Sequence, residues 1–508
     1  MELDFARQAD LIWALLPEIV LSVTGMVVLL AGVWNRNKPG SQDPVWLGGL
    51  ALGGILLTGA VNGWLYGVQE VGSEGIIALD SFRLFANWLF LLGAALTIVV
   101  SFDYVERQRL QVGEFYALIL FATVGMMFMG GARDLILIFL GLETMSVAAY
   151  VLTAYNRRSR QSAEAGLKYF ILGAFSTGFL LYGIALAYGA TGTTNVAQMA
   201  ASIEAGAGLS GLLLVSIGLL AVGFAFKVGA VPFHMWTPDV YEGAPSPATA
   251  YMAAAVKAAS FVAFARVFLV AFEGVYTSWF PILWWLAALT MVVANLVALT
   301  QANVKRMLAY SSIAHGGYLL VAVAAANQMA TAGLLFYLLV YTFMTIGAFG
   351  VLMIVSRQSE DRLQLEDYSG LGWQQPALGV VFTIFLLSLA GFPGTGGFMG
   401  KIYLLQGAVE AHLWTLAVIL VLTTVLSYFY YLRVSWYMWM RPAPEGQQED
   451  GEGGPPVPPL TMKSALVATA GILLFLGIFP GGILEFALNS TEGLFPTGPE
   501  LLGSETGP

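Results

Sequence analysis

The sequence predicts an all-α polytopic membrane protein with about fourteen transmembrane helices. The 508-residue chain is 58% hydrophobic and 10% charged, and its mean hydropathy of +0.76 lies outside the range of soluble globular domains. Apolar runs of about 20 residues, each long enough to cross a hydrocarbon core, recur between short polar breaks. These runs lack the two-residue alternation of a membrane β-barrel, so a helical bundle is expected.

The expected spans are bounded by the polar breaks. The first ten residues are acidic, the reverse of a basic signal-peptide start, so the first apolar run is expected to remain as a helix. In chain order the spans cover residues 11–34, 45–66, 79–101, 114–131, 134–154, 162–188, 211–236, 246–271, 279–299, 303–325, 329–356, 376–411, 412–441 and 462–486.

Proline interrupts the seventh and twelfth spans. Pro232 and Pro393 lack an N–H group and leave the carbonyls of Val228 and Leu389 without their helical partners. Helices broken at membrane depth are tolerated where they line a cavity, and in transporters they mark the transport site. An ordinary proline kink is the alternative interpretation.

Helix order suggests an internal repeat. Spans four to eight and nine to thirteen each contain five helices with the interrupted one in fourth place, which is the pattern of two inverted repeats. The expected divisions are an N-terminal three-helix segment (1–113), two five-helix repeats (114–271 and 279–441), a cytoplasmic linker (442–461), the last transmembrane helix (462–486) and a disordered tail (487–508).

Basic residues gather in alternate loops. The other set of loops holds only Arg7, Arg83 and Arg133, so the positive-inside rule makes the richer set cytoplasmic and places both termini outside. The richer set comprises Arg36, Lys38, Arg107, Arg109, Arg157, Arg158, Arg160, Lys305, Arg306, Arg357, Arg362, Arg441 and Lys463.

Composition excludes several functions. The chain has no cysteine, which rules out thiol catalysis, disulfides and cysteine-ligated iron–sulfur clusters within it. His234, His315 and His412 are its only imidazoles, so neither a haem nor a metal site is expected. No phosphate-binding loop or dinucleotide fingerprint occurs, and the chain is expected neither to hydrolyse ATP nor to carry electrons.

Basic residues also fall inside the expected spans. They are Lys168, Lys227, Lys257, Arg266, Lys401 and Arg433. A charge at mid-bilayer costs on the order of 3 kcal/mol, so such residues usually mark an ion or proton pathway. Arg266 and Arg433 lie nearer helix ends and are expected to anchor at the interface. Lys168 follows Glu164 by four residues, a spacing that suits either a local salt bridge or a relay where protons enter.

Glu143 is the one acid deep in an expected span, and Lys227 is its expected partner. Lys257, His315 and Lys401 are also central. Burial disfavours the charged form of a lysine and a nearby carboxylate favours it, so moving the acid would load or eject a proton. These five residues form the predicted row of titratable groups. The structural alternative is that they only pair and hold helices together.

Three stretches of the chain are distinctive, namely Phe224–Pro245, Lys305–His315, and Ala390-Gly391-Phe392-Pro393 with Gly400-Lys401 beyond. They resemble the N-type antiporter-like subunits of respiratory complex I. The resemblance covers nearly the whole chain. L-type, M-type and Mrp-type relatives typically have a Leu-Pro-Asp-Ala-His-like run where this chain has Thr237-Pro238-Asp239-Val240-Tyr241, and the M-type usually has Glu at the place of Lys401.

The resemblance implies a proton-translocating subunit of NADH:quinone oxidoreductase in the inner (plasma) membrane, with no redox chemistry or cofactor of its own. NADH, FMN, iron–sulfur clusters and quinone would belong to partner subunits, both membrane and peripheral, and no nucleic acid is involved. By position, Glu143 and Lys227 would form a charge pair, Lys257 would connect, and Lys401 would gate the exit side. His315 would be a residue of the polar axis.

Two other functions stay open. A Mrp-type cation/proton antiporter subunit would transport sodium. A non-conducting scaffold would only buttress neighbouring subunits, and would tolerate neutralisation of Glu143, Lys227 and Lys401.

Overall fold

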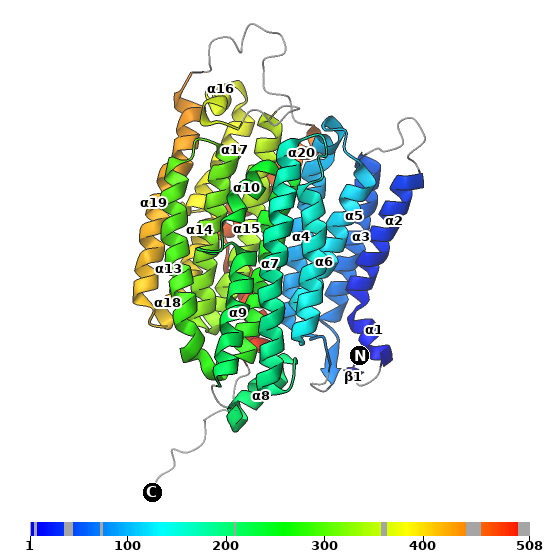
Figure 1. Cartoon of the computed structure of the whole chain (residues 1–508). Coiled ribbons are helices and arrows are strands. Elements are labelled where there is room, and N and C mark those ends of the chain that lie inside the picture. The colour runs from blue at the N-terminus through cyan, green and yellow to red at the C-terminus, as the bar shows by residue number, and fades with distance from the viewer. Residues whose placement is uncertain are drawn as a thin grey trace.

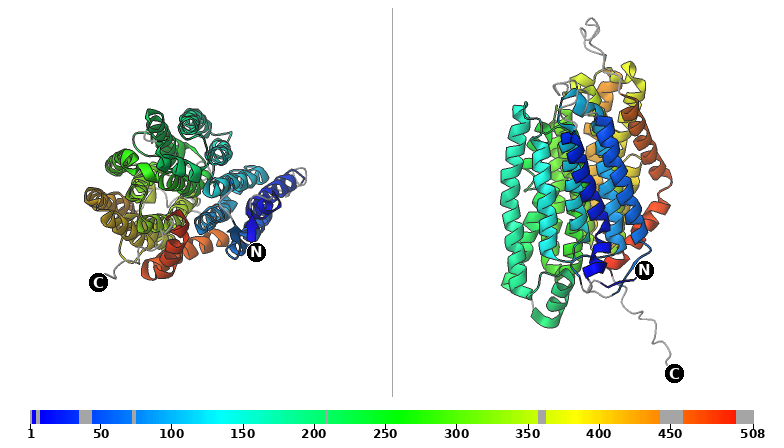
Figure 2. Two further views of the ribbon diagram at one scale, coloured as in Figure 1. Left: turned by 90° about the horizontal axis from the view of Figure 1, so that it is seen from below. Right: turned by 90° about the vertical axis from the view of Figure 1, so that its right-hand side faces the viewer.

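The protein is a bundle of roughly parallel helices (Figures 1 and 2). The structure, a computed structural model, describes residues 2–4, 8–34, 44–71, 75–207, 210–356, 363–442 and 459–495. In these ranges thirteen helical segments are long and apolar enough to cross a membrane. The remaining expected span, the twelfth, consists of two shorter helices, and the all-α polytopic fold is confirmed.

The N-terminal segment contains three spans beside a short parallel ribbon. Its elements are β1 (Glu2–Asp4), α1 (Gln8–Ala14), α2 (Leu16–Trp34), α3 (Pro44–Leu65), β2 (Gln69–Val71) and α4 (Ser81–Arg107). Gly32 of α2 faces Gly113 so closely that a Cβ on either would lie 2.8 Å from the other's Cα. Small residues at this crossing therefore let α2 pack directly on α5 (Val112–Gly131), which carries Gly113.

The first set of five spans follows. It comprises α5 (Val112–Gly131), α6 (Leu135–Thr153), α7 (Arg160–Thr191), the outlying α8 (Val196–Ser202) with a turn at Ile203–Ala207, α9 (Gly211–Val228), α10 (Trp236–Gly243), α11 (Ser246–Tyr251) and α12 (Lys257–Arg266). Two π-helical segments, Met252–Val256 and Val267–Ala271, flank α12 and join it to α11 and to a 3₁₀ turn at Glu273–Val275. The seventh span is broken between α9 and α10, as expected.

The second set has the same number of spans. It comprises α13 (Tyr276–Thr300), α14 (Val304–Ala325), α15 (Gln328–Val355), a 3₁₀ turn (Leu365–Tyr368), α16 (Leu371–Gln374), α17 (Pro376–Ala390), α18 (Gly396–Glu410) and α19 (Trp414–Met440). The break between α17 and α18 divides the twelfth span into halves of 15 residues each. An inverted relation between the two sets remains a prediction.

The C-terminal segment differs from the expected one. The last span is α20 (Leu460–Ile478), and Pro480 separates it from α21 (Gly481–Thr491) and a 3₁₀ turn at Glu492–Leu494. The expectation of a disordered tail from residue 487 is therefore wrong as far as residue 495. Ala487 and Leu494 are buried because α21 packs against α4 and α15. Most of the expected linker 442–461, and the tail beyond 495, lie outside the described residues.

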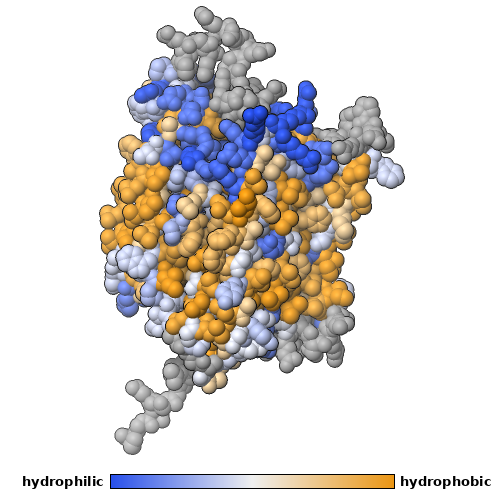
Figure 3. Space-filling model, viewed as in Figure 1, coloured by the Kyte–Doolittle hydropathy of each residue, from blue (hydrophilic) through white to orange (hydrophobic). Residues whose placement is uncertain are grey.

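The membrane-facing surface is an apolar band. Figure 3 shows hydrophobic residues around the waist of the bundle and hydrophilic ones gathered at its upper end. The spans α11–α12, α14 and α15 are the most completely buried, whereas α2 and α20 are the most exposed. Of the expected cytoplasmic cations, those at 107–109, 157–160, 305–306, 441 and 463 lie at helix ends, while Arg36, Lys38, Arg357 and Arg362 are outside the described residues. β1 and α21 (red in Figure 2) both lie at the lower end of the bundle (Figures 1 and 2).

Candidate functional site

The first helix break places Lys227 in the interior. Gly229 ends α9 with a left-handed backbone (φ +73°), and Pro232 then prevents the helix from resuming at once. The chain turns until Trp236 starts α10 and stacks on Tyr169 of α7. Lys227 thus lies in the last turn of α9, buried, next to a segment whose backbone is not helical.

Lys227 donates hydrogen bonds to two side chains of α6. Its Nζ lies 2.8 Å from Ser146 Oγ and 3.3 Å from the Tyr150 hydroxyl. The expected direct pair with Glu143 is not formed, because no described acid lies within 4 Å of Lys227 Nζ. Glu143 lies one helical turn before Ser146, half-buried, and acts on Lys227 electrostatically. Ser146 and Tyr150 hold the ammonium in place of the carboxylate.

Lys257 lies where π-helical backbone meets α-helix. It is the first residue of α12, directly after the segment Met252–Val256, and its side chain is buried. Its ammonium donates to the carbonyl and to the hydroxyl of Ser312 on α14, and also lies 5.6 Å from the centre of the Tyr341 ring. π-Helical turns inside α-helices are frequent at functional sites.

His315 is surrounded by tyrosines. Its Nδ1 lies 2.5 Å from the Tyr337 hydroxyl and its Nε2 lies 3.1 Å from the Tyr431 hydroxyl. The Tyr431 hydroxyl also bonds the Ser311 hydroxyl, and the Tyr341 ring lies 5.0 Å from the imidazole. Both ring nitrogens of the buried imidazole therefore have partners that can exchange a proton with it.

Lys401 closes the second helix break. Gly391 ends α17 with a left-handed backbone (φ +85°), so the last carbonyls of α17 lack helical N–H donors. The Lys401 ammonium donates to two of these carbonyls instead, that of Leu389 at 3.2 Å and that of Ala390 at 2.9 Å. The carbonyl that Pro393 was expected to free at Leu389 is thus bound by Lys401. The ammonium also lies 4.9 Å from the centre of the Tyr318 ring.

The titratable residues, together with the hydroxyl groups that bind them, fall into two groups. The first group is Glu143, Ser146, Tyr150 and Lys227, on α6 and α9. The second group is Lys257, Ser312, His315, Tyr337, Tyr431 and Lys401, on α12, α14, α15, α18 and α19. In the second group His315 shares an aromatic neighbour with each lysine, namely Tyr341 with Lys257 and Tyr318 with Lys401. No hydrogen bond in the described part of the chain joins the side chains of the two groups.

Lys168 belongs to a separate ion network at the basic end. Its Nζ lies 2.7 Å from Glu164 and 2.9 Å from Asp239 of α10, and 42% of its side chain is exposed. Arg306 of α14 lies 3.0 Å from Asp239 and 2.6 Å from Glu242. Although partial burial opposes it, hydrogen bonds from Lys168 and Arg306 hold the pKa of the Asp239 carboxyl below its usual range. Lys168 therefore lies at the surface rather than in the row.

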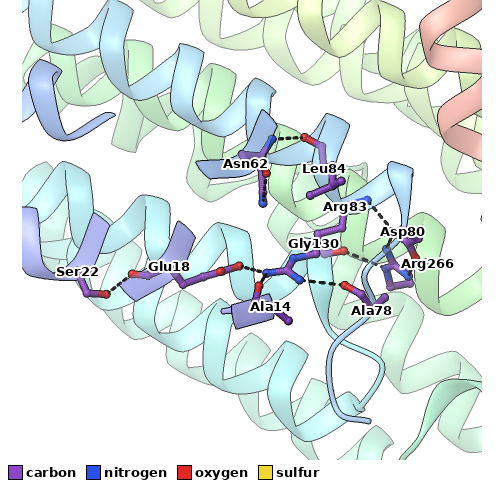
Figure 4. A network of polar contacts seen from close by, with 11 residues as sticks. Ala14, Glu18, Ser22, Asn62, Ala78, Asp80, Arg83, Leu84, Gly130 and Arg266 are labelled. Atoms are coloured by element: carbon purple, nitrogen blue, oxygen red, sulfur yellow. Dashed lines mark hydrogen bonds and ion pairs between the residues drawn. The ribbon is translucent and has the colours of Figure 1, made fainter. Parts of the chain in front are cut away.

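Two arginines form buried ion pairs at the opposite end, where Figure 4 shows the network. Arg266 binds both oxygens of Asp80 at 2.8 Å, and Arg83 binds Glu18 at 2.7 Å with both side chains almost fully buried. Burial opposes ionisation of Asp80, but the Arg266 guanidinium holds the pKa of this carboxyl below its usual range. The expectation that Arg266 anchors at the interface is wrong, because Asp80 and the Gly130 carbonyl bind it inside the protein.

Sequence reasoning found the basic residues of the site but missed their hydroxyl partners. Helical spacing could have indicated three of them, since Ser146 and Tyr150 follow Glu143 by three and seven residues on α6 and Ser312 precedes His315 by three on α14. Tyr337 and Tyr431 carry no such signal, because they lie on α15 and α19. Arg433, in contrast, lies near a helix end as expected and donates to the carbonyls of Leu299 and Gln301.

Each of the two broken helices carries a buried lysine, Lys227 on α9 and Lys401 on α18. A helical bundle with this arrangement is that of an antiporter-like membrane subunit. A sequence profile described as "NADH:quinone oxidoreductase/Mrp antiporter, TM" matches residues 132–427, which is more than half of the chain. Similar proteins include NADH-quinone oxidoreductase subunit N of Trichlorobacter lovleyi, 48% identical over 94% of this chain and 96% of the relative, and that of Gemmatimonas aurantiaca, 45% identical over 97% and 96%. The chain belongs to the family of NADH-quinone oxidoreductase subunit N.

Solved structures agree with this assignment. A chain of respiratory complex I from Thermus thermophilus with bound aureothin is 36% identical, with a TM-score of 0.77 over 93% of this chain and 99% of that one. A chain of the Mrp complex from Dietzia sp. DQ12-45-1b is 22% identical with a TM-score of 0.79 over 94% and 98%, a likeness of fold. The relation to subunit N therefore rests on sequence as well as fold.

Proposed function

We propose that this chain is the proton-translocating subunit N of an NADH:quinone oxidoreductase, and that protons move through the two groups of buried titratable residues. The observation that supports this most is the second group, in which each of two buried lysines lies near a tyrosine ring that also neighbours the imidazole of His315. Hydroxyl groups of Ser312, Tyr337 and Tyr431 bind Lys257 or His315. Hydroxyls accept and donate at once, so they can relay a proton.

The first group would control the charge of Lys227. Ser146 and Tyr150 hold the ammonium by neutral hydrogen bonds, and the Glu143 carboxylate acts on it from a distance. Approach of the carboxylate would favour the charged lysine, and its withdrawal would release a proton toward Lys257. Lys401, bound to carbonyls of the second helix break, would be the last lysine before the exit. Lys168 and Asp239 would be a surface relay where protons enter.

The energy comes from partner subunits. Moving one proton against 100 mV takes about 2.3 kcal/mol, and this chain has no sequence feature for redox or ATP chemistry. NADH, FMN, iron–sulfur clusters and quinone would therefore bind the other subunits of the complex. The complex would lie in the inner (plasma) membrane with the basic end of the bundle in the cytoplasm and both termini outside.

Substitution of Lys227 tests the proposal. In the assembled complex, Lys227→Ala should abolish redox-coupled proton translocation while leaving assembly intact, and Lys227→Arg should abolish it as well, because a guanidinium keeps its charge and cannot release a proton. Lys463→Ala, at an exposed lysine outside both groups, is the matched control. Normal translocation by Lys227→Ala in proteoliposomes would remove Lys227 from the path.

Two further measurements separate the other functions. Sodium uptake by proteoliposomes that contain the purified chain alone would favour a cation/proton antiporter. Unchanged proton translocation after joint neutralisation of Glu143, Lys227 and Lys401 would favour a scaffold.

A further inference from the structure

A hollow of about 400 Å³ opens at the basic end of the bundle, away from both groups of titratable residues. Its walls come from α2, α5 and α6 and from the two loops that follow α4 and α6. The lower walls are apolar and include Leu29, Leu118, Phe121 and Val151. The hollow therefore extends from the level of the helix ends into the apolar band.

Three arginines line the rim of this hollow. Arg109, Arg157 and Arg158 are exposed, and Glu114 is the only acid among the lining residues. In the described part of the chain, none of the three arginines forms an ion pair within 4 Å. Arg107 differs from them, since it binds Asp103 at 2.6 Å and the carbonyls of Met353 and Ser356. The rim thus has a positive excess that is available to an anion.

The backbone at Arg109 points to a role for its side chain. Arg109 has a φ of +50°, in the left-handed region where a helix end usually places glycine. The residue follows the last turn of α4, and the next amide, that of Leu110, donates to the carbonyl of Val105. Glycine would take this conformation without strain, whereas an arginine here carries a local backbone cost.

A second hollow lies on the other side of α6. It measures about 340 Å³, lies against α7 at Gly166 and Phe170, and shares Val151, Tyr155 and Arg157 with the first. Unlike the first hollow, it is also lined by Tyr150, a residue of the first group. Arg157 therefore lies above the boundary between two apolar grooves. The Tyr155 hydroxyl donates to the carbonyl of Gln111 at 2.8 Å and fixes the wall between them.

We propose that the hollow between α2, α5 and α6 binds one anionic glycerophospholipid from the cytoplasmic leaflet. The phosphate lies among Arg109, Arg157 and Arg158, because one guanidinium group can donate two parallel hydrogen bonds to two phosphate oxygens. One acyl chain lies along Leu118 and Phe121, and a second chain can lie in the adjoining groove beside Phe170. Zwitterionic lipids lack the net charge that the rim selects.

Lipid retention by the intact complex tests this site. Complex carrying Arg109→Gln, Arg157→Gln and Arg158→Gln together is titrated with phosphatidylglycerol, cardiolipin or phosphatidylethanolamine, and bound lipid is counted by native mass spectrometry. We expect the half-saturating concentration of either anionic lipid to rise at least tenfold relative to the wild type. Arg441→Gln, a cation at the same end but outside the hollow, should change nothing.

A second test uses a photoreactive phosphatidylglycerol and the unsubstituted complex, so it does not depend on assembly of the triple variant. With a diazirine on its acyl chain, it should label peptides that contain Phe121 or Val151 in the unsubstituted complex. The proposal would be overturned if the complex retained phosphatidylethanolamine as well as it retains the anionic lipids. It would also be overturned if the probe labelled other peptides of this chain, or if it labelled a neighbouring subunit and no peptide of the hollow. These readouts do not depend on proton translocation, so this site and the proposed pathway fail or stand separately.

Discussion

Tyr431→Phe is the most direct test of the second group, because one hydroxyl serves two partners. It binds His315 Nε2 at 3.1 Å and the Ser311 hydroxyl, and all three side chains are buried. Phenylalanine keeps the ring and removes only the oxygen. A buried polar group left without its partner costs about 1–3 kcal/mol, and each 1.4 kcal/mol of added barrier slows a step about tenfold. We expect proton translocation to slow about 5-fold to 150-fold.

The assay is proton uptake by proteoliposomes that contain the complex, measured with a pH-sensitive dye. NADH oxidation is recorded in parallel with an uncoupler present, so that a redox defect is distinguished from a translocation defect. Tyr251→Phe is the matched control, since this buried hydroxyl also has two partners, Thr123 at 2.7 Å and the Ile119 carbonyl at 2.9 Å. It lies outside both groups.

Two results would refute the reasoning. Wild-type rates and proton-to-NADH ratios in Tyr431→Phe would show that protons do not pass this hydroxyl. An equal loss in Tyr251→Phe would show that the effect is one of general packing.

The remaining predictions concern stability. Asp80→Asn should destabilise the complex by about 3–5 kcal/mol, since it leaves the buried Arg266 guanidinium without its carboxylate, and a thermal melt should recover in Asp80→Leu combined with Arg266→Met. Because the pKa of Asp80 is lower in the folded protein than in the unfolded chain, its stabilisation should be complete above about pH 4 and be lost as the pH falls through the folded value, which melts of Asp80→Asn should not show. Gly397→Ala should disrupt the second helix break, as its Cβ would lie 1.8 Å from the Ser388 carbonyl oxygen, whereas Gly471→Ala, in open space, should leave yield and activity unchanged.

Most of the fold could be predicted because it follows from local pattern. Apolar length predicted the spans, and Pro232 and Pro393 predicted the two interruptions. The left-handed backbone of Gly229 and Gly391 at these breaks was not predicted. The π-helical segments beside Lys257 could not be predicted, since Met252–Val256 and Val267–Ala271 are apolar runs like those of regular helices. Their geometry depends on how α11 and α12 pack between other helices.

The site was predicted only as a set of basic residues and one acid. Its pairings depend on contacts between segments far apart in the chain, as Arg266 with Asp80 and Lys257 with Ser312 illustrate. Depth in a span was also an unreliable guide to environment. Arg266 lies near a span end and is buried, whereas Lys168, inside another span, has a partly exposed side chain.

The two halves of the chain meet at α14. Arg306, in its first turn, binds Asp239 and Glu242 of α10, the helix that follows the first break. Ser312, six residues further along, receives the Lys257 ammonium from α12. Six residues of α-helix span about 9 Å, and both residues belong to one unbroken helix. We therefore expect a shift of α10 at the first break to move the Ser312 hydroxyl relative to Lys257, with α14 as the element that contacts both the surface ion pairs and the buried lysine.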